Sequence, residues 1–463
     1  MTSTETIIAL ATPAGSGAIA VLRISGPEAI AMAANRFKAE SGRSLTEVAG
    51  HTIHLGTIRE GSRVLDQVLA SVFRGPRSYT GEDVVEISCH GSPYIQQEIL
   101  QLFLKDGCRM AQPGEFTLRA FLAGKMDLSQ AEAVADLIAS ENQASHQIAL
   151  QQMRGGYSSE IQKLREELIH FASMITLELD FSGEDVEFAE RDEFHNLLNK
   201  LSGLLKSLID SFAMGNVFKT GIPVAIAGEP NVGKSTLLNA LLKEEKAIVS
   251  DIAGTTRDAI EDEISIGGIG FRFIDTAGIR ETSDTVENIG IQRTHEKMDQ
   301  SRMILYLLDG AALQDKDRSS LKEALKALQE AHPQKPLLVL VNKADKMSDE
   351  QKNWVQEDIP SPLLISARTG SGLDALQEEL LNHVNRGLLQ NQDPVVSNSR
   401  HYEALLNAQK AIDEVKRGLS EEIPADLLSV DINQALHHLG EITGEISSDD
   451  LLGNIFANFC IGK

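Results

Sequence analysis

The sequence predicts a multidomain protein, with an α/β domain at the N-terminus, an all-α central domain, and a doubly wound α/β domain inserted into the helical one. The chain has 463 residues, which is more than a single hydrophobic core usually supports. The spacing of apolar residues also changes along the chain, from short strand-like runs to helical stripes and then to alternating strands and helices. A content of 42% hydrophobic and 24% charged residues is typical of a folded protein.

The first segment, residues 1–120, has the pattern of a mixed α/β domain. Short apolar runs such as TIIALAT, AIAVLRISG, LASVF and VVEIS are separated by glycine, proline and polar residues. Their length and β-branched content are typical of strands bounded by turns. Residues 121–218 are helical in pattern, because apolar side chains recur every three or four positions, as in the stretch from Leu164 to Leu179. We therefore expect a helical domain to begin near residue 121.

Residues 219–385 alternate strand-like and helical segments. The apolar runs are IPVAIAG, FRFIDTAG, MILYLLDG, PLLVLVNKAD and PLLISA, and polar helical sequence lies between them. This alternation predicts a doubly wound parallel sheet. Residues 386–463 return to a helical pattern. The simplest architecture therefore inserts residues 219–385 into one helical domain that is built from both flanking segments.

The charge and the cysteine content restrict the possible functions and the location. Lys and Arg total 43 against 67 Asp and Glu, a formal net charge of −24. Because phosphate neutralisation supplies most of the affinity for nucleic acid, we expect tight binding of nucleic acid only together with a more basic subunit. Three cysteines are too few for a disulfide framework, and the sequence has neither the pattern of a signal peptide nor that of a membrane span. We expect a cytoplasmic protein.

A phosphate-binding loop lies between a strand-like run and a helical one. The octapeptide GEPNVGKS at residues 228–235 matches the pattern G-x-x-x-x-G-K-[ST], and its context is the one that the motif requires. The glycines allow successive backbone N–H groups to face phosphate oxygens, and the helix N-terminus favours negative charge. We expect Lys234 to reach the β- and γ-phosphates and the Ser235 hydroxyl to bind Mg²⁺.

Two motifs that follow are expected to contact the γ-phosphate and the metal ion. The sequence GTT at residues 254–256 lies where a switch loop should close over the γ-phosphate, with Thr256 as a second hydroxyl ligand of Mg²⁺. The sequence DTAG at residues 275–278 ends a strand. The Asp275 carboxylate can hold a Mg²⁺-bound water, and the Gly278 N–H can donate to the γ-phosphate.

The last two motifs select the base. The sequences NKAD at residues 342–345 and SAR at residues 366–368 each follow a strand-like run. One carboxylate at Asp345 can accept hydrogen bonds from both N1–H and the 2-amino group of guanine, whereas adenine offers no such donor pair. A buried carboxylate without partners is costly, so Asp345 favours GTP over ATP. These motifs resemble those of translation-factor-related GTPases over about 160 residues.

One position departs from the pattern of many regulatory GTPases. The residue that follows the DTAG motif is Ile279, where a glutamine often orients the attacking water. An aliphatic side chain cannot orient water, so another residue or a cation must assist. Glu287, in the sequence ETSDTVE, is a candidate if its segment moves inward. From the residues alone, a solvated acid on an acidic protein is favoured over a catalytic role for Glu287.

Four further motifs extend the resemblance to the whole chain. These are LRISG at 22–26, SYTGED at 78–83, PGEF at 113–116 and the closing FCIGK at 459–463. With the inserted nucleotide domain, they make the chain similar to the tRNA modification GTPases of the MnmE (TrmE) family. The resemblance implies a folate-binding-like N-terminal domain, an all-α central domain and an inserted P-loop GTPase domain.

The resemblance also implies a folate site and a constitutive homodimer that forms through the N-terminal domain. Arg23, Glu86, Lys125 and Lys463 match the positions that bind formyl- or methylene-tetrahydrofolate in the family. A pterin edge presents a guanidine-like donor pair that suits Glu86, and glutamyl carboxylates suit cations. The segment HGSP at residues 90–93 departs from the family's usual His-Gly-Gly at Ser92.

For the nucleotide domain, the resemblance implies hydrolysis that depends on K⁺ and on pairing of two such domains. The K⁺ ligands would be Asn231 together with carbonyl groups near Ser250, Ile252 and Thr255. Glu287 matches the family's catalytic glutamate, and Lys234 completes the catalytic set in this domain. The expected GTP contacts are Asn231, Val232, Gly233, Lys234, Ser235, Thr236, Ser250, Thr255, Thr256, Asp275, Thr276, Ala277, Gly278, Asn342, Lys343, Asp345, Ser366 and Ala367.

In this family an FAD-dependent partner subunit joins the dimer in a heterotetramer, and the complex modifies carbon 5 of the wobble uridine of certain tRNAs. The modification adds an aminomethyl or carboxymethylaminomethyl group. Cys460 lies near the folate in the family and is a candidate catalytic residue, and a small buried thiol with no chemical role is the alternative. An alternative function for the chain is a ribosome-assembly GTPase without folate chemistry. The N-terminal domain and the FCIGK tail disfavour it, because an assembly factor needs neither.

Overall fold

The computed structural model describes residues 5–180, 191–246, 261–275, 297–384, 394–421, 423–457 and 459–462. The chain divides into two compact units. The first unit combines residues 1–138, 151–205 and 403–463, and the second combines residues 139–150 and 206–402. Segments from both sides of the second unit thus belong to the first, which agrees with the predicted insertion of an α/β domain into a helical one.

The first unit contains a seven-stranded sheet at its N-terminal end. The strand order is β3-β4-β5-β6-β2-β1-β7, and every neighbouring pair is antiparallel except β1 and β7. The strands are β1 (Ile7–Leu10), β2 (Ile19–Ser25), β3 (Phe37–Ala39), β4 (Thr52–Glu60), β5 (Arg63–Phe73), β6 (Val84–His90) and β7 (Arg109–Met110).

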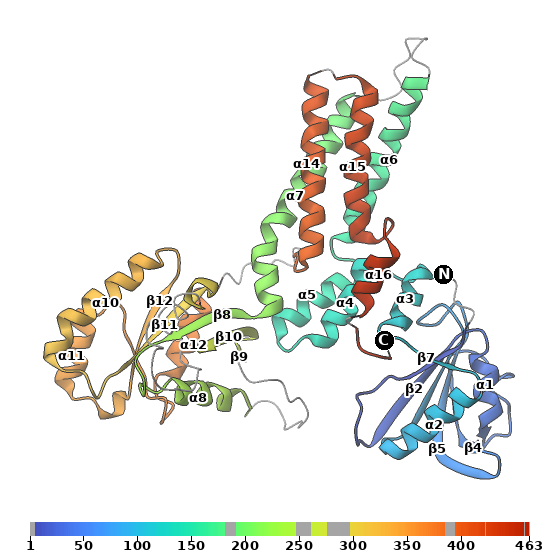
Figure 1. The fold of residues 1–463 in the computed structure, drawn as a ribbon, viewed down its shortest axis with the longest axis horizontal. Helices are drawn as coiled ribbons and strands as arrows, with labels where there is room; N and C mark the ends of the chain where they lie inside the picture. Colours follow the sequence, from blue (N-terminus) through green and yellow to red (C-terminus); the bar gives the residue numbers. More distant parts are fainter. Residues whose placement is uncertain are drawn as a thin grey trace, which may run out of the picture. The chain divides into compact units, whose positions relative to one another are not determined.

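Helices α1 (Ala29–Arg36) and α2 (Pro93–Lys105) pack on one face of this sheet (Figure 1). Side chains alternate between the two faces along a strand, and Ala20, Leu22 and Ile24 of β2 point into the core. The runs singled out in the sequence are confirmed as β1, β2, β5 and β6. Strand β4 was not among them.

Long helices form the rest of the first unit. Within it, α6 (Ser158–Asp180) packs against α15 (Ala425–Thr443), and the rings of Phe171 on α6 and Phe194 on α7 stack at 5.0 Å. Figure 1 shows α6, α7 (Arg191–Thr220), α14 (Ser399–Ser420) and α15 running alongside one another. Residues 191–205 of α7 and 403–420 of α14 belong to the first unit. The shorter helices are α3 (Glu115–Leu122), α4 (Leu128–Ala139) and α16 (Asp449–Ala457). Helices from both flanks of the inserted domain therefore share one bundle, as predicted.

The second unit contains a six-stranded sheet of order β13-β12-β11-β8-β10-β9. Five strands are parallel, as the doubly wound pattern predicts, but β9 is antiparallel to β10 at the edge. The predicted doubly wound parallel sheet is therefore confirmed, and the sequence did not predict the additional antiparallel strand β9 at its edge. The strands are β8 (Ile222–Ala227), β9 (Glu261–Ile266), β10 (Ile269–Asp275), β11 (Met303–Asp309), β12 (Leu337–Asn342) and β13 (Leu363–Leu364).

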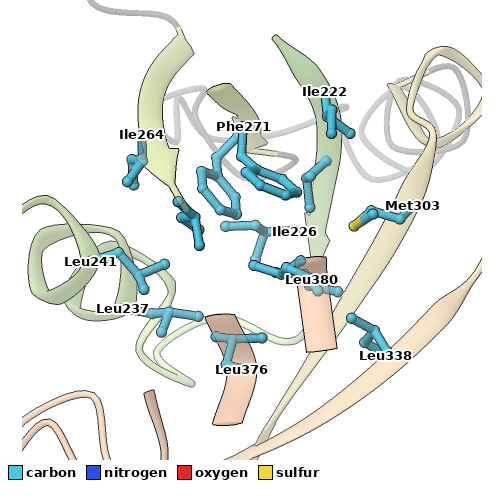
Figure 2. Packing of buried hydrophobic residues seen from close by; sticks show 14 of the residues in the cluster. Ile222, Ile226, Leu237, Leu241, Ile264, Phe271, Met303, Leu338, Leu376 and Leu380 are labelled. Carbon is cyan, nitrogen blue, oxygen red and sulfur yellow. The ribbon is translucent and has the colours of Figure 1, made fainter. Parts of the chain in front are cut away.

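Apolar side chains fill both faces of this sheet. Figure 2 shows the larger cluster, in which Leu237 of α8 and Leu376 of α12 meet Ile226 and Phe271 from the central strands. A second cluster on α10 and α11 includes Trp354. The helices of this unit are α5 (Gln143–Met153), which continues into the first unit, α8 (Lys234–Lys246), α10 (Arg318–Ala331), α11 (Asp349–Asp358) and α12 (Leu373–Asn382). Two short 3₁₀ turns are η1 (Asp315–Asp317) and η2 (Ala344–Lys346).

Within the described residues, no helix combines the length and the apolar character that crossing a lipid bilayer would require.

Candidate nucleotide and folate sites

The phosphate loop connects the end of β8 to the first residue of α8. Lys234 opens the helix, is 8% exposed, and donates from Nζ to the Gly228 carbonyl at 2.7 Å. Its ammonium group therefore lies within the loop rather than in solvent. The first N–H groups of α8 have no partners within the helix, and together with the helix dipole they favour an anion at this end. The arrangement suits the phosphates of a nucleotide.

Asn342, the first residue of the NKAD motif, joins three of the predicted motifs. Its side-chain Nδ2 donates to the Val232 carbonyl of the phosphate loop at 2.8 Å. Its Oδ1 accepts from the Ala367 N–H of the SAR motif at 3.0 Å. Asn342 is 3% exposed, so both bonds lie away from bulk water. The structure thus brings the phosphate loop and both base-selecting motifs together, as the sequence predicts.

Asp345 is ionised and ready to accept hydrogen bonds. A side-chain hydrogen bond with Ser366 is the largest cause that lowers the pKa of Asp345, and the positive charges of Lys346 and Arg368 add to it. A carboxylate held in the charged form can accept from two guanine donors at neutral pH. Asp345 is exposed in this structure, and its selection of guanine stays a prediction.

Several predicted residues lie outside the described part of the chain. Asp275 is the last residue of β10, and only its backbone is described. The others are Ser250, Ile252, Thr255, Thr256, Thr276, Ala277, Gly278 and Glu287. Their predicted roles in binding the γ-phosphate, Mg²⁺ and K⁺, and in activating water, stay predictions.

In the first unit, two of the four expected folate residues face each other across neighbouring strands. Arg23 of β2 and Glu86 of β6 are register partners, and Arg23 Nε donates to Glu86 Oε1 at 2.8 Å. Their side chains are 14% and 27% exposed. The Arg23 guanidinium also lies over the rings of Tyr79 and Phe116, with its carbon 5.2 and 5.6 Å from the ring centres. A carboxylate beside aromatic rings suits a flat heterocycle with a donor edge.

The C-terminal tail, residues 459–462, also contacts Arg23. Arg23 Nη1 lies 3.4 Å from the Gly462 carbonyl, and Phe459 is buried against Leu128 and Phe456. Lys463, the next residue after Gly462, is outside the described residues. Lys125 hydrogen-bonds through Nζ to the Pro76 carbonyl, just before the SYTGED segment. Arg23, Glu86 and the tail are therefore together, whereas no described contact joins Lys125 to them.

A buried ionic network supports the SYTGED segment, and the sequence did not single out its members as functional. Glu82 accepts from the Ser25 hydroxyl at 2.7 Å and from Arg119 Nη1 at 3.0 Å. Arg119, 7% exposed, also binds Glu115. Burial alone would raise the pKa of Glu115, but hydrogen bonds from Arg109, from a backbone N–H and from Arg119 outweigh it, so the pKa lies below its ordinary value. The network fixes the segment that carries Tyr79.

Serine fits at position 92, where the family usually has glycine, without backbone strain. Ser92 precedes α2 as its N-cap residue, with φ −78° and ψ 128°. Any amino acid can adopt this extended backbone conformation. The turn therefore does not require the glycine that the family usually has at this position.

Cys460 is exposed, so the alternative of a small buried thiol is wrong. The side chain that packs inward from the tail is Phe459, and the chain turns outward immediately after it. Exposure keeps a chemical role for Cys460 open as a prediction.

The three cysteines should differ in reactivity. Burial raises the pKa of the Cys89 thiol to about 11, with Asp66 adding to the effect. Burial also raises the pKa of Cys108 to about 11, with Asp106 adding. Because only the thiolate reacts readily, and about a thousandth of such a thiol is ionised at pH 8, iodoacetamide should modify only Cys460 in the native protein. Peptide mass spectrometry would check this, with urea-unfolded protein modified at all three positions as the control. Native modification of Cys89 or Cys108 would contradict the expected burial.

Comparisons with known proteins identify the family of this chain. A family model described as the MnmE helical domain matches residues 128–460, and one described as the GTP-binding protein TrmE N-terminus matches residues 6–125. The tRNA modification GTPase MnmE of Christiangramia forsetii is 61% identical over 470 residues, which cover 99% of this chain and 99% of that protein. The proteins of the same name from Flavobacterium psychrophilum and Bacteroides fragilis are 61% and 52% identical, again over 99% of both chains. These matches extend through both units, and the chain belongs to the MnmE family of tRNA modification GTPases.

Proposed function

We propose that this chain hydrolyses GTP to drive the modification of carbon 5 of the wobble uridine in certain tRNAs, acting with an FAD-dependent partner subunit and a one-carbon tetrahydrofolate. The observation that carries the GTPase part is the pair of hydrogen bonds in which the Asn342 side chain donates to the Val232 carbonyl and accepts from the Ala367 N–H. They hold the phosphate loop and the base-selecting loops of one nucleotide site together. Hydrolysis would drive a conformational cycle, not the carbon chemistry itself.

The charge that develops during phosphate cleavage would be neutralised by cations. Ser235 and Thr256 are the proposed Mg²⁺ ligands. Asn231, with carbonyl groups near Ser250, Ile252 and Thr255, would bind K⁺ where other GTPases place an arginine. The backbone of Asn231 has φ 62°, a left-handed conformation that asparagine tolerates better than most residues. Glu287 would orient or activate the attacking water through a second water.

The folate would bind beside Arg23 and Glu86, and would supply the one-carbon unit when bound. The Glu86 carboxylate suits the donor edge of a pterin, and the partial exposure of both side chains leaves them accessible. Lys125 and Lys463 would bind carboxylates or complete the site. Cys460, which is exposed close to the tail contact with Arg23, would contribute chemistry there.

An exposed apolar face of the N-terminal sheet supports the homodimer. Ile53 and Leu55 of β4, Leu69 of β5 and Ile19 of β2 are between 44% and 67% exposed. They lie on the face of the sheet opposite α1 and α2, because their strand neighbours point into that core. Contiguous exposed apolar surface marks an interaction site. A second copy of the chain is the proposed occupant, and Arg23 lies on the same face.

The acidic charge supports a role for the partner subunit in holding tRNA. The net charge is −24, yet residues 1–125 contain equal numbers of basic and acidic residues. The excess negative charge therefore belongs to the helical and nucleotide domains, which would repel an RNA backbone. We propose that tRNA binds through the complex in the cytoplasm. The ribosome-assembly alternative has no feature that favours it, since relatives with the tRNA modification name match nearly the whole chain.

Potassium dependence tests the proposed hydrolysis mechanism. GTP turnover by the full chain should be more than about tenfold faster in KCl than in NaCl of equal ionic strength, because a bound cation replaces an arginine that is worth far more than this in other GTPases. Phosphate release measured in the two salts would check it. Binding of a fluorescent GDP in both salts is the control, since the base contacts do not involve the cation. Equal turnover in the two salts would contradict the K⁺ proposal while leaving GTP hydrolysis intact.

A further inference from the structure

Asp309 is a carboxylate at the edge of the nucleotide site that belongs to none of the recognised motifs. It is the last residue of β11 and the register partner of Asn342 at the end of β12. One carboxylate oxygen, Oδ1, accepts from the Ala311 N–H at 3.1 Å. The other, Oδ2, accepts from Lys343 Nζ at 2.6 Å. The turn after β11 thus fixes the carboxylate, and the carboxylate fixes Lys343.

Lys343 also reaches the phosphate loop. Its Nζ lies 3.3 Å from the Asn231 carbonyl, so the same ammonium group contacts the end of β11 and the loop that holds the phosphates. Lys343 has φ 62°, a left-handed conformation that is unfavourable for a lysine. Contacts of its side chain must therefore help to hold the NKAD segment in this conformation.

The ion pair between Lys343 and Asp309 is partly buried. The side chains of Lys343 and Asp309 are 32% and 22% exposed, so both are partly shielded from water. The two strands end side by side, and the Gly310 N–H donates to the Asn342 carbonyl at 2.8 Å. Without Asp309, the Lys343 side chain would regain most of its rotamer freedom. Because the Asp309 carboxylate fixes the lysine before a nucleotide binds, binding costs less conformational entropy.

We propose that Asp309 is a positioning residue for guanine nucleotide binding, which holds Lys343 over the Asn231 carbonyl and so fixes the base-selecting loop against the phosphate loop. This inference rests on the proposed GTP site. Asp309 acts through Lys343, so its removal weakens GTP and GDP to a similar extent and leaves the cleavage step nearly unchanged. Because Asn231 is the proposed K⁺ ligand, the K⁺ concentration for half-maximal turnover also rises.

The test uses the full chain with Asp309→Asn, which keeps the size of the side chain and removes its charge. The Kd of a fluorescent GDP should rise about tenfold, as expected for the loss of one charged hydrogen bond at a partly shielded site. The turnover rate at saturating GTP and saturating K⁺ should stay within about twofold. Asp315→Asn is the matched control, since Asp315 also has a cationic partner, Arg318, but is 84% exposed and lies outside the site. Its Kd and turnover should be those of the parent.

A double-mutant cycle with Lys343→Gln separates positioning from general destabilisation. If Asp309 acts through Lys343, the two substitutions together weaken GDP little more than Lys343→Gln alone. Additive losses, or an unchanged Kd in Asp309→Asn, would overturn the inference. Asp309→Glu keeps the charge and should show an intermediate Kd. It provides the test if the asparagine variant does not fold. A parent protein that binds no GDP would instead overturn the proposed GTPase function.

Discussion

Replacing Gly233 by alanine should weaken nucleotide binding by about two orders of magnitude. Gly233 has φ 104°, in the left-handed region that alanine disfavours, and an added Cβ would overlap the Asn342 Nδ2 atom. Either the loop or the Asn342 side chain must move to relieve this overlap, and either movement breaks the bond from Asn342 to Val232. Strain and overlap together are worth about 3 kcal/mol, so the Kd of a fluorescent GDP should rise by a factor of about one hundred.

The control for Gly233→Ala separates backbone strain from the overlap. Gly61 also has a positive φ, 61°, but an added Cβ there would meet nothing within 4 Å. Gly61→Ala should therefore cost about 1 kcal/mol of unfolding free energy and leave GDP binding unchanged. Fluorescence titration and thermal unfolding of both variants would check this. Tight GDP binding by Gly233→Ala would mean that the contact between Asn342 and the phosphate loop is not needed.

The nucleotide site was largely predictable because its chemistry is contiguous in the sequence. The phosphate loop, NKAD and SAR are short segments at strand ends, and a parallel sheet places the ends of its strands along one edge. The position of Asn342 against Val232 follows from this rule. Asp309 was not predicted, because a lone aspartate at a strand end has no spacing that distinguishes it from a surface acid.

The antiparallel strand β9 at the edge of the nucleotide sheet was not predicted, because only the five parallel strands were recognised in the sequence. The segment EDEISIGGIGFRFID contains two strands joined by Gly267 and Gly268, whose φ angles of 58° and 82° are those of a tight hairpin turn. In β9, Ile264 and Ile266 are buried and alternate with polar residues. A two-glycine turn between alternating runs was the signal that predicts an antiparallel pair.

The proposed folate site was harder to predict from the sequence because its parts are far apart in the chain. The contact from Arg23 to Gly462 joins residues at the two ends of the sequence, and Arg119 reaches Glu82 from another element. No periodicity or spacing encodes such pairs. Only the resemblance to a family indicated Arg23 and Glu86. The exposure of Cys460 depends on how the tail turns after Phe459, which composition cannot indicate.

Replacing Gly462 by alanine should impair folate binding while sparing the nucleotide site. Gly462 has φ 101°, and an added Cβ would overlap the Leu10 carbonyl oxygen. The tail would have to leave β1, which removes the Gly462 carbonyl from Arg23 and displaces the terminal Lys463 from the proposed site. The Kd of formyl-tetrahydrofolate, measured by calorimetry, should rise about tenfold or more, because an ordered charged contact is lost. GTP turnover in KCl should stay within about twofold.

Gly453→Ala is the matched control for the tail. Gly453 lies in α16, a few residues before the tail, and an added Cβ there would meet nothing within 4 Å. Alanine is the better helix former, so this variant should bind folate normally and be slightly more stable. If Gly462→Ala also binds folate normally, the tail is not part of the site, and the proposed folate role of Lys463 is contradicted.

If the parent chain itself shows no saturable folate binding, and cells that lack it keep normal wobble nucleosides, the ribosome-assembly alternative gains the support that it now lacks. A folate defect in Gly462→Ala alone, with normal GTP turnover, would instead establish that the C-terminal residues complete the one-carbon site.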